Sequence, residues 1–159
     1  MEQPPTTAGI ADSADQIAYG VTHYLTVEGL RRARLEADTA YFYQSPQTAD
    51  MIGVRVTFYS LSGEETSTLT SDEGTYYWRT GNMEARGDVV GVTPDGRRLE
   101  TSILDYTSND NRINGSEPFV YTASNRRIEG GSFTSDPDFR DLVATQPRGT
   151  VGRVDVERQ

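Results

Sequence analysis

Apolar and polar residues alternate along most of the chain, which is the pattern of β-strands with one buried face. The first alternation covers residues 17–27, and the second covers residues 33–43, with charged residues on its other face. The second stretch is rich in Ala, Leu and Arg, but its period of two and its aromatic end favour a strand. No segment has a convincing helical period, so the pattern predicts an all-β domain.

A hairpin is the clearest local prediction. Within residues 69–92, two β-rich runs face each other across residues 79–82, which include the turn-forming pair Gly-Asn. Gly74 and Gly87 interrupt the two runs, and a glycine inside a strand often marks a bulge or a bend. Further strands are predicted at residues 54–59, 99–106, 112–114, 118–121 and 127–134.

Turn glycines recur along the chain. Gly29, Gly63 and Gly96 are separated by 34 and 33 residues, and each is followed by a strand that carries a tyrosine near its end. This period is typical of stacked strand–turn units, which are unstable alone and together bury one continuous apolar strip. The repeat therefore predicts a sheet built from successive strand–turn units.

The composition of the chain excludes some classes of partner, and its distribution along the chain indicates where the folded domain begins and ends. The chain has 159 residues, a formal net charge of −9, and no cysteine. The negative charge argues against nucleic acid as a partner, and the absence of cysteine excludes disulfides. Residues 1–15 are expected to form a flexible tether, residues 16–139 the folded domain, and residues 140–159 a mostly disordered tail.

Catalytic chemistry has little support in the sequence. His23 is the only histidine, and it lies on an apolar alternation, where packing is more common than catalysis. No serine is accompanied by a nucleophile-elbow pattern, and residues 110–121 lack the acidic residue that closes a calcium loop. We therefore expect no catalytic residue, no metal site and no cofactor, and we do not expect an enzyme.

Several segments, taken in order, carry a resemblance to a known family. They are LEADTAY at 35–41, GVRVTFY at 53–59, the stretch 69–76, MEARGDV at 83–89, DGRRL at 95–99, LDY at 104–106 and IEGGSF at 128–133. In this order they resemble the LptC-like proteins of lipopolysaccharide export, within the OstA-like group, over about residues 17–139. The resemblance implies an open, V-shaped antiparallel β-jelly roll with an apolar interior.

The resemblance also implies a role in lipid transfer without catalysis. Such a module accepts lipopolysaccharide acyl chains in its interior, and it passes them from an inner-membrane ABC transporter to a periplasmic LptA-like bridge protein. It would lie in the periplasm, at the inner membrane, through an anchor that this chain does not include, either a membrane helix or a lipidated cysteine. The alternative from another class is a structural or adhesive β-repeat module that binds protein or glycan and no lipid.

Apolar and aromatic residues are the candidate lipid-binding positions. They are Val54, Val56, Phe58, Leu69, Tyr76, Trp78, Met83, Val90, Leu104, Tyr106, Ile113, Phe119 and Phe133. An ordinary sandwich core explains each of them equally well, whereas an open jelly roll leaves the core accessible at its ends. Because the chain is acidic, affinity would have to come from acyl chains, at about 0.8 kcal/mol per buried methylene.

Two strands are predicted to be the edges of the sheet, at residues 17–27 and 127–134. Neither contains a proline or a lysine, and the second has a predicted bulge at Gly130 and Gly131. An unguarded edge offers main-chain hydrogen bonds to a partner strand. The partner-edge residues are Val21, Leu25, Ile128 and Phe133. The resemblance assigns the N-terminal edge to the transporter and the C-terminal edge to the bridge protein.

Overall fold

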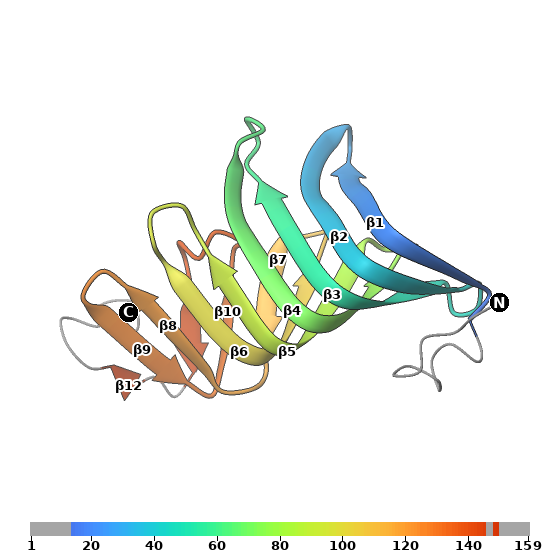
Figure 1. The fold of residues 1–159 in the computed structure, drawn as a ribbon. Coiled ribbons are helices and arrows are strands. Elements are labelled where there is room, and N and C mark those ends of the chain that lie inside the picture. The colour runs from blue at the N-terminus through green and yellow to red at the C-terminus, as the bar shows by residue number, and fades with distance from the viewer. Residues whose placement is uncertain (1–13, 146–147, 150–159) are drawn as a thin grey trace.

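The computed structural model describes residues 14–145 and 148–149, and every element in this part of the chain is a β-strand. The strands join in one open antiparallel sheet, so the all-β prediction is confirmed (Figure 1). β1 begins at Gln16, where the predicted tether ends. The first thirteen residues of that tether lie outside the described residues.

The first six strands form a meander. The strands of the whole described part are β1 (Gln16–Val27), β2 (Leu30–Tyr43), β3 (Thr48–Tyr59), β4 (Glu65–Tyr77), β5 (Asn82–Val92), β6 (Arg98–Thr107), β7 (Arg112–Gly115), β8 (Phe119–Ala123), β9 (Arg126–Gly130), β10 (Ser132–Ser135), β11 (Val143–Thr145) and β12 (Arg148–Gly149). Each strand from β1 to β5 pairs with the next, and the sheet divides at β6. One end of β6 pairs with β8, which leads to β9 and β12, and the other pairs with β7, which leads to β10 and β11.

A crease crosses the long strands and bends the sheet into two arms (Figure 1). Arm I carries the turns at 28–29, 60–64 and 93–97, and arm II carries the turns at 44–47, 78–81 and 108–111. The predicted turn glycines Gly29, Gly63 and Gly96 all lie in the turns of arm I, with positive φ. The repeat in the sequence therefore corresponds to one arm of the folded sheet.

Glycines in the left-handed region form the crease. Gly53 and Gly87 have φ of 70° and 84°, which residues with a Cβ rarely adopt. A Cβ on Gly53 would overlap the carboxylate of Asp38, and one on Gly87 would lie 2.9 Å from Asp72 Oδ2. The bend expected at Gly87 is therefore present, and an aspartate of the neighbouring strand occupies the space above each of these glycines.

The crease also changes which residues face inward. In β3, Val54, Val56 and Phe58 are buried on one side of Gly53, whereas Met51 and Ala49 are buried on the other. A strict period of two along each strand was therefore the wrong expectation. Tyr19, which the pattern places on the face of Val21, is 63% exposed, because Gly20 between them has a positive φ.

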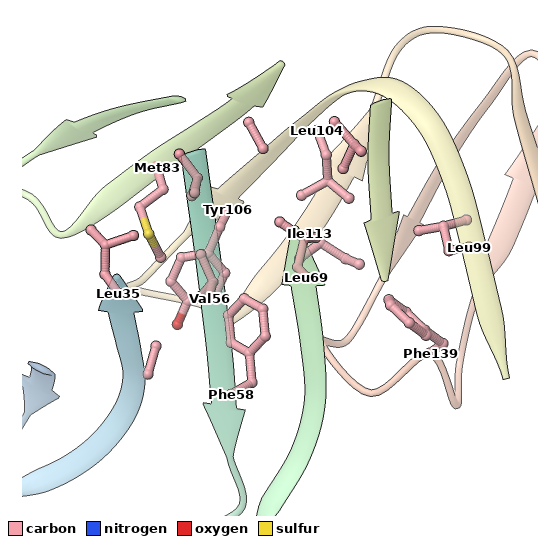
Figure 2. Packing of buried hydrophobic residues seen from close by; sticks show 14 of the residues in the cluster. Leu35, Val56, Phe58, Leu69, Met83, Leu99, Leu104, Tyr106, Ile113 and Phe139 are labelled. Carbon is pink, nitrogen blue, oxygen red and sulfur yellow. The ribbon is translucent and has the colours of Figure 1, made fainter. Parts of the chain in front are cut away.

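The apolar core lies between the arms (Figure 2). Phe58 of arm I packs against Tyr106 of arm II, with ring centroids 5.2 Å apart. The Tyr106 hydroxyl donates a hydrogen bond to Asn111 Oδ1 at 2.7 Å, and burial raises the pKa of Tyr106 to about 12. The residues around this contact leave a void of only about 20 Å³, so the middle of the molecule is a packed core.

The folded part extends beyond residue 139. Phe139 and Leu142 are buried in the core cluster, and β11 pairs with β10. Ser67 Oγ donates to the Pro137 carbonyl oxygen at 2.7 Å, and Arg97 donates to the Asp138 carbonyl oxygen at 2.7 Å. Of the tail expected from residue 140, residues 140–145 are therefore part of the fold, and residues 146–147 and 150–159 lie outside the described residues.

The predicted C-terminal edge is not an edge. Residues 127–134 belong to two strands, β9 and β10, which lie on different branches of the sheet. Ile128 is 1% exposed and pairs with Tyr121 on one side and Gly149 on the other. Phe133 is also buried, between β7 and β11. Among the described strands, β1, β11 and β12 have one partner each, so β1 lies at an edge of the described sheet.

A candidate ligand-binding cup at the β1 end

A cup of about 470 Å³ lies between the two arms at the β1 end of the sheet. Arm I contributes Val21, Thr22, His23 and Leu35, and arm II contributes Asp15, Gln16, Ala40, Phe42, Gln44, Ala49, Met51, Tyr76 and Trp78. The floor consists of buried apolar side chains, and most of the polar side chains are exposed at the rim. Among the described strands, β1 is the last on this side, so no other described strand covers the interior here.

Aromatic side chains form the walls of the cup. The rings of Phe42 and Trp78 have centroids 6.0 Å apart, and both side chains are half-buried. Tyr76 stacks at a tilt against His23, with centroids 5.1 Å apart. Aromatic walls of this kind offer a large apolar contact area to a ligand.

One hydrogen bond joins the two arms across the cup. His23 Nε2 and the Tyr76 hydroxyl are 3.0 Å apart. Burial raises the pKa of Tyr76, so the phenol keeps its proton at neutral pH. The single histidine of the chain therefore lies in the cup wall, with its ring paired to a tyrosine.

The crease explains why these residues meet. In β2, Leu35 and Ala37 face inward before the crease, and Ala40 and Phe42 face inward after it. The uninterrupted alternation places Tyr41 on this face instead. The shift of one position therefore brings Phe42 opposite Trp78 and so builds the aromatic wall.

The rim is polar, and among its described residues it carries one charge, that of Asp15. The Asp15 backbone N–H donates to the Phe42 carbonyl oxygen at 2.8 Å, and the Asp15 carboxylate accepts from the Gln44 backbone N–H at 2.6 Å. Gln16, Thr22 and the edge of His23 complete the rim. Among the described residues that line the cup, none is an arginine, and the chain contains no lysine.

The sequence-predicted lipid residues fall into groups in the structure. Tyr76 and Trp78 line the cup. The residues around the small central void are Val54, Val56, Phe58, Leu69, Met83, Leu104 and Tyr106. Ile113, Phe119 and Phe133 are buried nearer the C-terminal branches, where Phe119 and Phe133 stack with centroids 4.9 Å apart. Val90 lies outside the core cluster, because its neighbour Val89 takes the inward position.

Sequence reasoning missed the residues that make the cup open. Phe42, Met51, Ala40 and Ala49 were not identified as binding positions, and Val21 was identified only as an edge residue. Leu25, the other residue predicted on the N-terminal edge, points inward and is buried beside Gly81. The sequence did offer one indication of these residues, because residues 17–27 were predicted to be an edge strand. Residues that face inward beside an edge strand have no further strand to cover them.

A second, shallower groove of about 530 Å³ lies on arm II. Tyr77, at 40% exposed, and Arg79 lie at one side, and Glu84 and Asp105 are directly opposite each other on β5 and β6. Desolvation, and then the charge of Glu84, raise the pKa of Asp105. Asn82 and Asn114 add amide groups, so the groove combines a ring with polar groups.

The remaining chemistry of the described region is limited. Among residues 14–145 and 148–149, no three His, Asp or Glu side chains gather closely enough to hold a metal ion. No helix in the part of the chain that the structure describes is long and apolar enough to span a membrane.

No protein-family model matches the chain, and no curated protein matches it. The function is therefore inferred from the residues of the cup.

Proposed function

We propose that this protein is a non-enzymatic lipid-binding module that takes an acyl chain into the cup between its arms. The observation that carries the proposal is an apolar cup of about 470 Å³ with a buried floor, aromatic walls and an exposed polar rim. Its volume and lining are typical of small-molecule sites. Each methylene that leaves water for such a site contributes about 0.8 kcal/mol.

The resemblance to the LptC-like family supplies the cargo and the route in this proposal. Lipopolysaccharide would arrive from an inner-membrane ABC transporter, place an acyl chain against Tyr76 and Trp78, and leave for a periplasmic LptA-like bridge protein. The protein would act in the periplasm at the inner membrane. β1 supports docking of the transporter beside the cup, because it is an edge strand and carries Val21.

Docking of the bridge protein requires a different edge from the one expected at residues 127–134. β9 and β10 both have partners on each side within the described sheet, so their backbone groups are already used. β11 and β12 each have one described partner and lie at the far ends of the two branches. We assign the bridge-protein contact to this end of the sheet, where binding of a partner strand should protect the β11 amides from hydrogen exchange. Unchanged exchange of those amides in the complex would count against this assignment.

Binding is testable through Trp78, the only tryptophan of the chain. Lipid A should shift or quench Trp78 emission, and Val21→Glu should weaken binding at least about tenfold, because it places a carboxylate in the apolar wall. Tyr19→Glu is the matched control, because it lies on the same strand but is exposed. It should leave both binding and the melting temperature nearly unchanged.

Two outcomes contradict the proposal. The first is the absence of lipid binding by fluorescence and by a second method, such as calorimetry. The second is equal loss of binding in Val21→Glu and Tyr19→Glu, because the cup would then not be the site.

The second groove favours the alternative, an adhesive module that binds glycan. An exposed ring next to carboxylate, amide and guanidinium groups offers stacking and hydrogen bonds to a sugar. Lipopolysaccharide from which the acyl chains have been removed separates the two functions. Binding of this polysaccharide that depends on Tyr77, with no binding of lipid A, would favour the alternative.

A further inference from the structure

The cup is blind. Its floor, which includes Leu35 and Met51, borders the central void of only about 20 Å³. Phe58 and Tyr106, which line that void, pack against each other and close the space between the arms. A ligand can therefore enter from the β1 end, but in this structure it cannot extend along the interior.

The volume of the cup is close to that of one acyl chain. A methylene group takes up about the same volume as a water molecule, roughly 30 Å³. A cup of about 470 Å³ then holds about fifteen carbon atoms. That volume suits a single acyl chain of ordinary length, so a lipid with several chains, such as lipid A, would place one of them in the cup.

The rim selects the head group. Anionic heads are usually held by arginine or lysine, which supply charge-assisted hydrogen bonds. Among its described residues, the rim has Gln16, Thr22 and Gln44 as neutral groups, and the one charge is the carboxylate of Asp15. Arg79 follows Trp78 in the chain but lines the second groove. The net charge of −9 adds a repulsion toward anions.

We propose that the preferred ligand of the cup is a single-chain amphiphile with an uncharged head that carries hydroxyl or amide groups. This inference rests on the proposed function, because it takes acyl binding in the cup as its starting point. The chain would fill the space between Val21, Phe42 and Trp78, and the head would meet the amide side chains of Gln16 and Gln44 at the rim.

Two series of ligands test the inference through Trp78 emission. Monoacylglycerols and fatty acids of about 8 to about 18 carbons are compared at about pH 8, where the fatty acid is ionised, and below their critical micelle concentrations. The monoacylglycerol should bind at least about tenfold more tightly than the fatty acid of the same length. Affinity should rise about fourfold per methylene and level off near about fifteen carbons, when the cup is full.

A rim variant supplies the control. Gln16→Arg places a cation at the rim, at an exposed position that pairs with Phe42. It should raise the affinity for the fatty acid about tenfold and weaken that for the monoacylglycerol, because the Gln16 amide is lost, so that the preference between the two ligands is reduced or reversed. Loss of both ligands in this variant, at an unchanged melting temperature, would contradict placement of the head group at the rim.

The outcomes separate this inference from the proposed function. Equal or tighter binding of the fatty acid by the unaltered protein would overturn the choice of head group. Affinity that keeps rising past about sixteen carbons, or tighter binding of a two-chain lipid, would overturn the single-chain limit. If lipid A binds and no single-chain lipid does, the inference fails and the proposed function stands. If no lipid binds, both fail.

Discussion

Replacement of Phe58 by aspartate should unfold the domain at neutral pH. Phe58 is 3% exposed and packs on Tyr106 across the two arms. Loss of the ring costs about 3–5 kcal/mol, and an unpaired carboxylate in this apolar site adds several kcal/mol more. The total is comparable with the whole stability of a typical domain, about 5–15 kcal/mol. Far-UV circular dichroism and urea denaturation measure the effect.

The control and the pH dependence make this prediction specific. Phe58→Leu keeps an apolar side chain and should cost less than about 1.5 kcal/mol. Burial should raise the folded-state pKa of the introduced carboxyl above its unfolded value of about 3.9, so the destabilisation should shrink as the pH falls below that folded-state value. A native spectrum and an unchanged urea midpoint for Phe58→Asp at pH 7 would show that water reaches Phe58 and that the open space extends to the middle of the molecule.

The second large effect is expected at the crease. Gly53→Ala should destabilise the domain by about 2–5 kcal/mol, because a Cβ at φ of 70° costs about 1–2 kcal/mol and also overlaps Asp38. Gly29→Ala is the matched control, because Gly29 has a φ of 79° and no atom within 4 Å of the added Cβ. Gly29→Ala should therefore lower the free energy of unfolding only by the cost of placing a Cβ at a positive φ, about 1–2 kcal/mol.

A double-mutant cycle identifies the contact. In an Asp38→Ala background, most of the extra cost of Gly53→Ala should disappear, with a coupling energy of about 1–3 kcal/mol. Denaturant unfolding of the four proteins gives this quantity. If Gly53→Ala and Gly29→Ala cost the same free energy, the side chain of Asp38 does not constrain the crease.

The local patterns of the sequence predicted the strands and turns well, because neighbouring residues determine both. The alternation at 54–59, the hairpin around residues 79–82 and the turn glycines Gly29, Gly63 and Gly96 are all present. The crease was only partly predictable. A glycine inside a strand can be a bulge, a bend or a regular position, and Gly74 is a regular position that pairs with Met51 and Ala85.

The C-terminal branches could not be predicted from neighbouring residues. Residues 127–134 resemble one strand with a double-glycine bulge, but each half is held by a partner distant in the chain. Phe139 lies beside Gly91 although the two residues are 48 positions apart in the chain. The cup escaped prediction for a related reason, because Phe42 and Trp78 come together only after the crease has shifted the inward face.

The order in which β1–β6 pair has a consequence for the speed and route of folding. Each of these strands pairs with its neighbour in sequence, so every pairing closes a short loop and gives the meander a low contact order for a β-protein. A nucleus can therefore form in any of its hairpins and grow strand by strand in both directions. The hydrogen bonds from Ser67 to Pro137 and from Arg97 to Asp138 close far longer loops, so the C-terminal segment should dock last and open first. Native-state hydrogen exchange should then find the β11 amides less protected than those of β3 and β4, and the reverse order would place the C-terminal segment in the nucleus.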